Sequence, residues 1–170
     1  MQNGKVLPIL LKTAVFTAIV PYAVGLWLPT QANHAFDESP FRIEPERWRT
    51  ILSLLFLLAG AAIYLWCAWD FSVKGLGTPA PIGAPKNLVV NGLYRFVRNP
   101  MYVGVFLLIV SRAIFFWSLP IVLYLLFVMV CVNLFIHLYE EPHLRTIFGE
   151  QYLEYCRRVP RWIPRFRSAQ

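Results

Sequence analysis

Two arginines and an Asn-Pro step lie together at the start of an apolar run. The stretch Gly92 to Tyr102 reads GLYRFVRNPMY, with Arg95 and Arg98 just before Asn99 and Pro100. Asn99 is a favourable N-cap, and Pro100 suits the first helical position because its missing N–H would have no helical partner there. A helix N-terminus flanked by arginines favours an anionic group. A basic membrane anchor followed by a capped helix fits the same residues, since basic residues flank most membrane helices.

A pair of adjacent carboxylates follows another apolar run. Glu140 and Glu141 come shortly after His137, and two ionised carboxylates at a membrane edge are unfavourable unless cations pair with them. The arginines of the first stretch, Arg95 and Arg98, could neutralise one, and a cationic ligand could neutralise the other. Cations at a helix start with anions opposite suit a zwitterionic ligand that bears an extra positive charge. Ion pairs that merely close the end of a helix bundle are the alternative.

The composition is that of an integral membrane protein. Of the 170 residues, 58% are hydrophobic, and the net charge is +7. The cations cluster beside apolar runs, which favours lipid headgroups as partners and argues against nucleic acid. Cys67, Cys131 and Cys156 are scattered without metal-ligand spacing, so we expect no metal site. We therefore predict an all-α membrane protein forming one domain over residues 1–170.

Four apolar runs predict four transmembrane helices. A run of about 20 apolar residues crosses a bilayer core, and the first run is too long for a typical signal peptide. A polar connector is expected from Pro29 to Arg49, and a Gly/Pro-rich loop from Phe71 to Asn99. An amphipathic helix is expected along the interface after Tyr139, broken near Gly149 and followed by a basic, aromatic tail suited to headgroups. The expected spans are Val6–Leu28, Ile51–Trp69, Met101–Trp117 and Ile121 to about His137.

The distribution of basic residues predicts the topology. With four spans, Lys5, the loop from Lys74 to Arg98 and the arginine-rich tail all fall on one side. The positive-inside bias then places both termini and the long loop in the cytosol. The short Ser118-Leu119-Pro120 turn forces the third and fourth spans into an antiparallel hairpin. Met101 and Glu140 are therefore expected to be neighbours at the cytosolic face.

Two longer stretches at this face resemble a known family. GLYRFVRNPMYVG and HLYEEPHLRTIFGEQYLEYCRRVPRW are similar to the integral-membrane methyltransferases that include isoprenylcysteine carboxyl methyltransferase and phospholipid N-methyltransferases. The resemblance covers roughly Gly75 to Trp162. The family's R-H-P-x-Y element corresponds to Arg98 through Tyr102, with Asn99 in place of histidine. That difference keeps a polar cap but removes a titratable ring.

The resemblance implies a methyltransferase that binds S-adenosylmethionine on the cytosolic side. It implies methyl transfer to a lipophilic acceptor, such as an isoprenylcysteine-type carboxylate or a lipid amine. Residues 1–70 would then supply two N-terminal spans, and residues 71–170 the cofactor-binding catalytic core. Glu140 and Arg98 are the expected catalytic residues. The expected cofactor-binding residues are Gly75, Gly77, Leu93, Tyr94, Arg98, Asn99, Pro100, Tyr102, His137, Glu140 and Glu141.

Two other functions fit the same sequence. A sterol-type membrane reductase would use NADPH, and the basic loop could meet the cofactor's phosphates. A non-enzymatic membrane scaffold would use the glutamate pair only to close the bundle. The acceptor, the membrane and the oligomeric state have no signal in the sequence.

Overall fold

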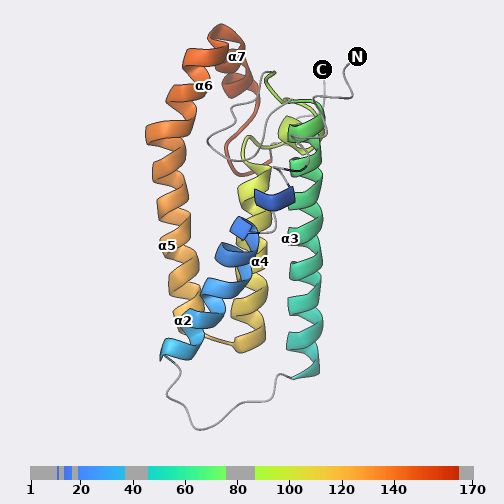
Figure 1. The fold of residues 1–170 in the computed structure, drawn as a ribbon, viewed down its shortest axis with the longest axis vertical. Coiled ribbons are helices and arrows are strands. Elements are labelled where there is room, and N and C mark those ends of the chain that lie inside the picture. The colour runs from blue at the N-terminus through green and yellow to red at the C-terminus, as the bar shows by residue number, and fades with distance from the viewer. Residues whose placement is uncertain (1–10, 12–13, 17–18, 37–45, 76–86, 165–170) are drawn as a thin grey trace.

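The structure is an elongated bundle of helices. The computed structural model describes residues 11, 14–16, 19–36, 46–75 and 87–164, and within these ranges the regular elements are all helical. In Figure 1, α4 lies between α3 and α5, and the C-terminal helices lie at one end of the bundle. In chain order the elements are η1 (Ala23–Trp27), α2 (Leu28–Phe36), α3 (Arg47–Val73), η2 (Gly92–Arg95), α4 (Pro100–Phe116), α5 (Leu119–Phe135), η3 (Ile136–Glu140), α6 (Glu141–Phe148) and α7 (Glu150–Arg158).

Three helices are long and apolar enough to cross a membrane, and a fourth is shorter. The three are Ala14–Ala35, Arg47–Val73 and Leu119–Phe148, and the shorter apolar helix is Pro100–Phe116. The fourth has 17 residues, which at 1.5 Å per residue span about 25 Å, near the lower limit for a crossing. The predicted all-α membrane fold is confirmed.

The first span ends later than the sequence predicted. A connector was expected from Pro29, but the helix continues through α2 to Phe36. Proline removes one backbone N–H and its ring crowds the carbonyl four residues earlier. The π-helical turn η1 ends two residues before Pro29, and such a wide turn makes room for the ring without ending the helix.

The second span is longer than predicted at both ends. It was expected from Ile51 to Trp69, whereas α3 runs from Arg47 to Val73. Arg49, expected in the polar connector, lies in the first turn and is only 5% exposed. Its guanidinium carbon lies 5.9 Å from the centre of the Trp117 ring at the end of α4. This cation–π contact explains how a charged residue joins an apolar helix.

The fourth span continues directly into the amphipathic segment. The sequence predicted a separate interfacial helix after Tyr139, but α5, η3 and α6 form one continuous helix, Leu119–Phe148. The π-helical turn η3 ends two residues before Pro142, the same spacing as that between η1 and Pro29. The predicted break at Gly149 is confirmed, since this residue has φ of +53° and separates α6 from α7.

Close backbone approach joins α3 to α4. A Cβ placed on Gly60 would lie 2.7 Å from the carbonyl oxygen of Gly104, and one on Gly104 would lie 3.0 Å from the backbone nitrogen of Tyr64. Small residues allow membrane helices to pack at this distance. Ile109 and Ile121 are fully buried between α4 and α5. The hairpin predicted from the Ser118-Pro120 turn is therefore present, and it positions the start of α4 beside the end of α5.

Candidate active site

The Asn-Pro step begins α4 as predicted. Asn99 is the N-cap and Pro100 is in the first turn, but the Asn99 side chain makes no capping hydrogen bond. Just before it, Gly92–Arg95 forms the short 3₁₀ helix η2, with Gly92 at φ of +61°. The N-cap position is confirmed, but the capping hydrogen bond expected from the Asn99 side chain is not formed.

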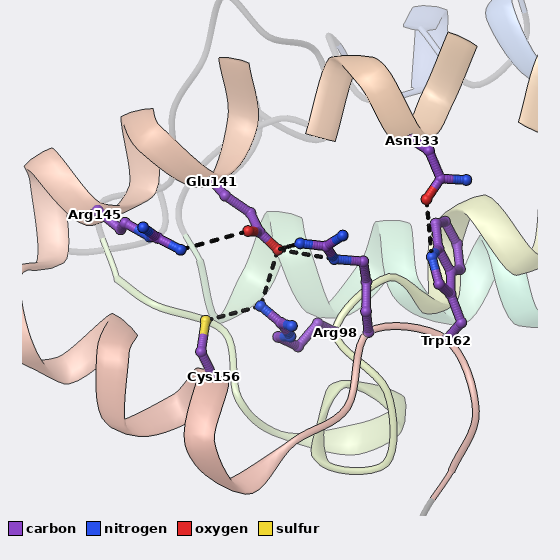
Figure 2. A network of polar contacts seen from close by, with 7 residues as sticks. Arg98, Asn133, Glu141, Arg145, Cys156 and Trp162 are labelled. Atoms are coloured by element: carbon purple, nitrogen blue, oxygen red, sulfur yellow. Dashed lines mark hydrogen bonds and ion pairs between the residues drawn. The ribbon is translucent and has the colours of Figure 1, made fainter. Parts of the chain in front are cut away.

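A cluster of arginines surrounds Glu141, which is 4% exposed. Arg98 donates from Nη1 to Oε1 at 2.9 Å, and Arg161 donates to the same oxygen from Nε at 3.1 Å and from Nη2 at 2.8 Å. Arg145 lies 3.7 Å from Oε2. Figure 2 shows Arg98, from the segment before α4, beside Glu141 and Arg145 of α6. The predicted proximity of Arg98 to the glutamate pair is confirmed.

Two further contacts hold Arg98 in place. Its Nη1 also donates to Sγ of Cys156 at 2.9 Å, and its backbone N–H donates to the Pro160 carbonyl at 2.9 Å. Burial disfavours the charged form, but the neighbouring Cys156 and Glu141 outweigh it and raise the pKa of Arg98. The guanidinium is therefore a permanent, fixed positive charge at the start of α4.

Glu140 has a different environment from Glu141. Its Oε2 accepts a hydrogen bond from the Tyr102 hydroxyl at 2.9 Å. Within the part of the chain that the structure describes, no lysine, arginine or histidine lies within ion-pair distance of Glu140. One carboxylate of the pair is thus neutralised by cations, and its neighbour is held by a neutral hydroxyl.

Two buried donors at the start of α4 lack an acceptor among the described residues. These are Nε of Arg98 and Nδ2 of Asn99. Buried polar groups in folded proteins are almost always hydrogen-bonded, so a pair of adjacent unsatisfied donors calls for an explanation. An anionic or acceptor-rich ligand at this point would supply the missing partner.

Tyr94 and Leu93 belong to η2, the short helix just before Arg98. Both contribute to an apolar core with Cys67 and Val89. The Tyr94 carbonyl accepts a hydrogen bond from the Tyr155 hydroxyl at 2.7 Å. Burial raises the pKa of both Tyr94 and Tyr155, so both phenols are neutral at physiological pH. The hydrogen bond from Tyr155 to the Tyr94 carbonyl ties η2 to α7.

A buried acidic residue near the end of α3 lies against η2. Asp70 is 3% exposed and pairs with Lys74 at 2.6 Å, and its Oδ2 has no hydrogen-bond partner in the described ranges. A side chain on Gly92 would overlap this oxygen. Gly75 is also confined, since a Cβ there would lie 2.6 Å from the Phe71 carbonyl oxygen. Gly92 therefore allows close packing against Asp70, and Gly75 allows close packing against Phe71 and Val89.

Several predicted residues do not join the arginine–glutamate cluster, and Gly75 is one of them because its neighbours are Phe71 and Val89. His137 is exposed on η3 and forms no hydrogen bond or ion pair with the cluster's side chains in the described part of the chain. Gly77 lies outside the described residues.

The C-terminal segment contributes residues that the sequence analysis did not select. The tail was expected to face headgroups, but Arg161 pairs with Glu141, and Trp162 inserts between α4 and α5. Trp162 donates from Nε1 to Oδ1 of Asn133 at 3.1 Å, and its ring lies 5.7 Å from that of Phe106 (Figure 2). The signal available in the sequence was Asn133, a polar residue within an apolar run that needs a partner.

Comparison with known proteins identifies the family. The profile of the phospholipid methyltransferase family matches residues 48–151. Protein-S-isoprenylcysteine O-methyltransferase B of Arabidopsis thaliana is 35% identical over 79 residues, covering 45% of this chain and 39% of that protein. Methanethiol S-methyltransferase of Crocosphaera subtropica (strain ATCC 51142 / BH68) is 39% identical over 89 residues, covering 47% of this chain and 30% of that protein.

The chain therefore matches well under half the length of these two relatives. No solved structure matches it significantly. The matched residues 48–151 run from the first turn of α3 to the first turn of α7. They therefore include Arg98, Tyr102, Glu140 and Glu141. The resemblance predicted from the sequence is confirmed: the chain belongs to the phospholipid methyltransferase family.

Proposed function

We propose that this protein is a membrane methyltransferase that transfers a methyl group from S-adenosylmethionine to a lipophilic acceptor. The observation that carries the proposal is the pair of buried, unsatisfied donors, Nε of Arg98 and Nδ2 of Asn99, beside the arginine cluster on Glu141. Family membership supplies the reaction class, and both relatives named above are methyltransferases.

The residues present fit this cofactor. S-adenosylmethionine carries a carboxylate, which suits the unsatisfied donors of Arg98 and Asn99 and the N-terminus of α4. It also carries an ammonium and ribose hydroxyls, which suit a carboxylate without a cation among the described residues, such as Glu140. When bound, the cofactor supplies an electrophilic methyl group on a positively charged sulfur.

The protein's own residues would orient the reactants and exclude water. Arg98 is fixed by Glu141, Cys156 and the Pro160 carbonyl, so its free Nε is already oriented before a ligand binds. Positioning of this kind is a large part of the acceleration available to a direct transfer. Trp162 packs on Phe106 of α4 and donates to Asn133 of α5, and it would help to keep water from this side of the site.

We also propose the orientation and the domain plan that the sequence favours. The Arg98 end of the bundle would face the cytosol together with both termini, and residues 1–170 would form one membrane domain. Residues 1–70 would brace the core, and 71–170 would hold the cofactor. The acceptor would approach from the lipid, since α3 and α5 expose large apolar side chains, among them Leu58 and Leu126.

Equilibrium dialysis of the detergent-solubilised chain with labelled S-adenosylmethionine tests the proposal. Arg98→Ala should weaken binding by at least tenfold, because each hydrogen bond to a charged group contributes about 1.5–3 kcal/mol. Arg158→Ala is the matched control, since Arg158 is exposed and pairs with Glu154 on α7. Asn99→Ala should weaken binding less than Arg98→Ala does.

Two results would contradict the proposal. Saturable NADPH binding without S-adenosylmethionine binding would indicate a reductase instead. Equal affinity in wild type, Arg98→Ala and Arg158→Ala would assign the arginine cluster to stability alone, as in a scaffold.

A further inference from the structure

An arginine inside the apolar helix α4 lacks a partner among the described residues. Arg112 is partly buried, and its Nε is shielded from solvent without an acceptor in the described ranges. None of the ion pairs in that part of the chain involves it. A guanidinium keeps its charge in proteins, and a charge within a membrane is costly unless an anion or a polar group meets it. Arg112 therefore needs a partner that the described helices do not supply.

A second unsatisfied polar group lies on the turn that follows α4. Ser118 is only 9% exposed, and its Oγ forms no hydrogen bond with the described residues. The backbone N–H of Ser118 donates to the carbonyl of Ala113 at 3.3 Å. Because Ala113 directly follows Arg112 in the chain, the hydroxyl and the guanidinium belong to the same end of α4.

The N-terminus of α5 adds positive character to this turn. Ser118 is the N-cap of α5, but its side chain makes no capping hydrogen bond, and Pro120 lies in the first turn. Proline has no backbone N–H with which the hydroxyl could bond. The remaining N–H groups of a first turn and the helix dipole favour an anion. A guanidinium, a buried hydroxyl and a helix N-terminus together suit a phosphate.

This end of the bundle has the features of a membrane interface. In Figure 1 the turn between α4 and α5 lies at the end opposite α6 and α7. Trp48 and Trp117 are exposed here and meet edge to face, and exposed tryptophans are typical of the headgroup level. Arg112 precedes Trp117 by about 7.5 Å along the helix axis, at 1.5 Å per residue. A long, flexible arginine side chain can reach headgroups from such a depth.

Arg112 also lies on the side of α4 that faces the first span. Gly104 meets Gly60 of α3, and Leu108 lies against Gly25 of η1. Arg112 follows these two residues of α4 at the same spacing of four, and each such step turns a helix by about 40°. It therefore continues the row from the α3 side toward the first span. Basic sites between transmembrane helices are typical places for anionic headgroups.

We propose that the turn between α4 and α5 binds the phosphate of an anionic phospholipid through Arg112, Ser118 and the N-terminus of α5. A phospholipid fits better than a dissolved anion because Trp117 and Leu119, which flank the donors, expose large apolar side chains. Arg49, over the Trp117 ring, adds a further cation and favours a lipid of net negative charge. The site is about 20 Å along α4 from its N-terminus, so the inference is independent of the proposed methyl transfer.

The thermal stability of the full chain in two lipid mixtures tests the inference. Nanodiscs of phosphatidylcholine are compared with nanodiscs that also contain phosphatidylglycerol, and the melting midpoint is measured in each. We expect phosphatidylglycerol to raise the midpoint of wild type and Arg112→Met to abolish this increase. Arg112→Met removes a charge from an apolar helix, so it should fold in phosphatidylcholine. Ser118→Ala should reduce the increase, and it decides the test if Arg112→Met does not fold. Arg47→Met is the matched control, since Arg47 is the exposed first residue of α3 at the same end, and it should keep the wild-type increase.

Native mass spectrometry of the detergent-solubilised chain supplies a second readout. Arg112→Met should weaken the binding of phosphatidylglycerol by roughly tenfold or more, as expected for the loss of a hydrogen bond to a charged group. An unchanged midpoint increase in Arg112→Met and Ser118→Ala would overturn the inference. An equal loss in Arg47→Met would also overturn it, because general surface charge would then explain the effect. If inorganic phosphate stabilises phosphatidylcholine nanodiscs as much as phosphatidylglycerol does, the site binds a dissolved anion and the lipid assignment is wrong.

Discussion

At each end of the helix bundle an arginine is held in place, but the contacts that hold it differ in kind. At the end that bears the candidate site, Arg98 is held by a carboxylate, a thiol and a backbone carbonyl, and its Nε lacks a partner among the described residues. At the opposite end, Arg49 lies over Trp117, whose ring also meets Trp48 edge to face at 5.9 Å. A cation on an aromatic surface serves packing, whereas a cation that is fixed by several acceptors and lies next to a second unsatisfied donor, Nδ2 of Asn99, suits a ligand.

Neutralising Glu141 should affect the site end most strongly. Glu141→Gln leaves three arginines without their shared counter-charge, and removal of one partner from a buried ion pair typically costs about 3–5 kcal/mol. We expect a large loss in the free energy of unfolding, measured by denaturant titration in detergent, together with weaker S-adenosylmethionine binding. Glu154→Gln should leave both unchanged because its ion pairs are exposed. A stable Glu141→Gln protein would show that the cluster is not the main support of this end.

The glycine at η2 should be the next most sensitive position. Gly92→Ala combines a positive φ, which costs about 1–3 kcal/mol, with displacement of the Asp70 carboxylate. Gly149→Ala is a comparison for backbone strain alone, since Gly149 has φ of +53° and ψ of −127° but no atom within 4 Å of the added Cβ. Both substitutions should reduce stability, but only Gly92→Ala should also lower cofactor affinity. Unchanged cofactor affinity in Gly92→Ala would mean that the contact with Asp70 is unimportant for the site.

Removing the arginine at the opposite end should have the smallest effect. Arg49→Met should reduce stability by about 0.5–2 kcal/mol, the range of a cation–π contact. Cofactor affinity should stay close to that of wild type, because this residue lies at the other end of α3 from Asp70. A loss of cofactor affinity comparable to that of Arg98→Ala would show that the two ends are coupled. The proposed division, with cofactor binding at the Arg98 end and packing around Arg49 at the other end, would then be wrong.

Periodicity and connectivity were sufficient for the general plan of the molecule. The apolar runs predicted the spans, and the tight turn at Ser118 placed Arg98 near the glutamate pair across 43 positions. The end of the first span was wrong because prolines and polar residues usually end helices, and the π turn before Pro29 depends on packing that the sequence does not display. Arg161 and Trp162 were missed for a related reason: a basic, aromatic tail suits a membrane surface equally well, and only the folded chain brings it against Glu141 and Asn133.

The turn η3 makes the candidate site sensitive to helical phase. Each α-helical residue advances by about 100° around the axis, so one residue removed before Glu140 would rotate both glutamates away from their present directions. A single-residue deletion within residues 136–139 should therefore separate Glu140 from Tyr102 and Glu141 from Arg98 at once, although both glutamates and their partners are still present. In this part of the chain, the number of residues between the membrane span and the carboxylates matters as much as the identity of the carboxylates.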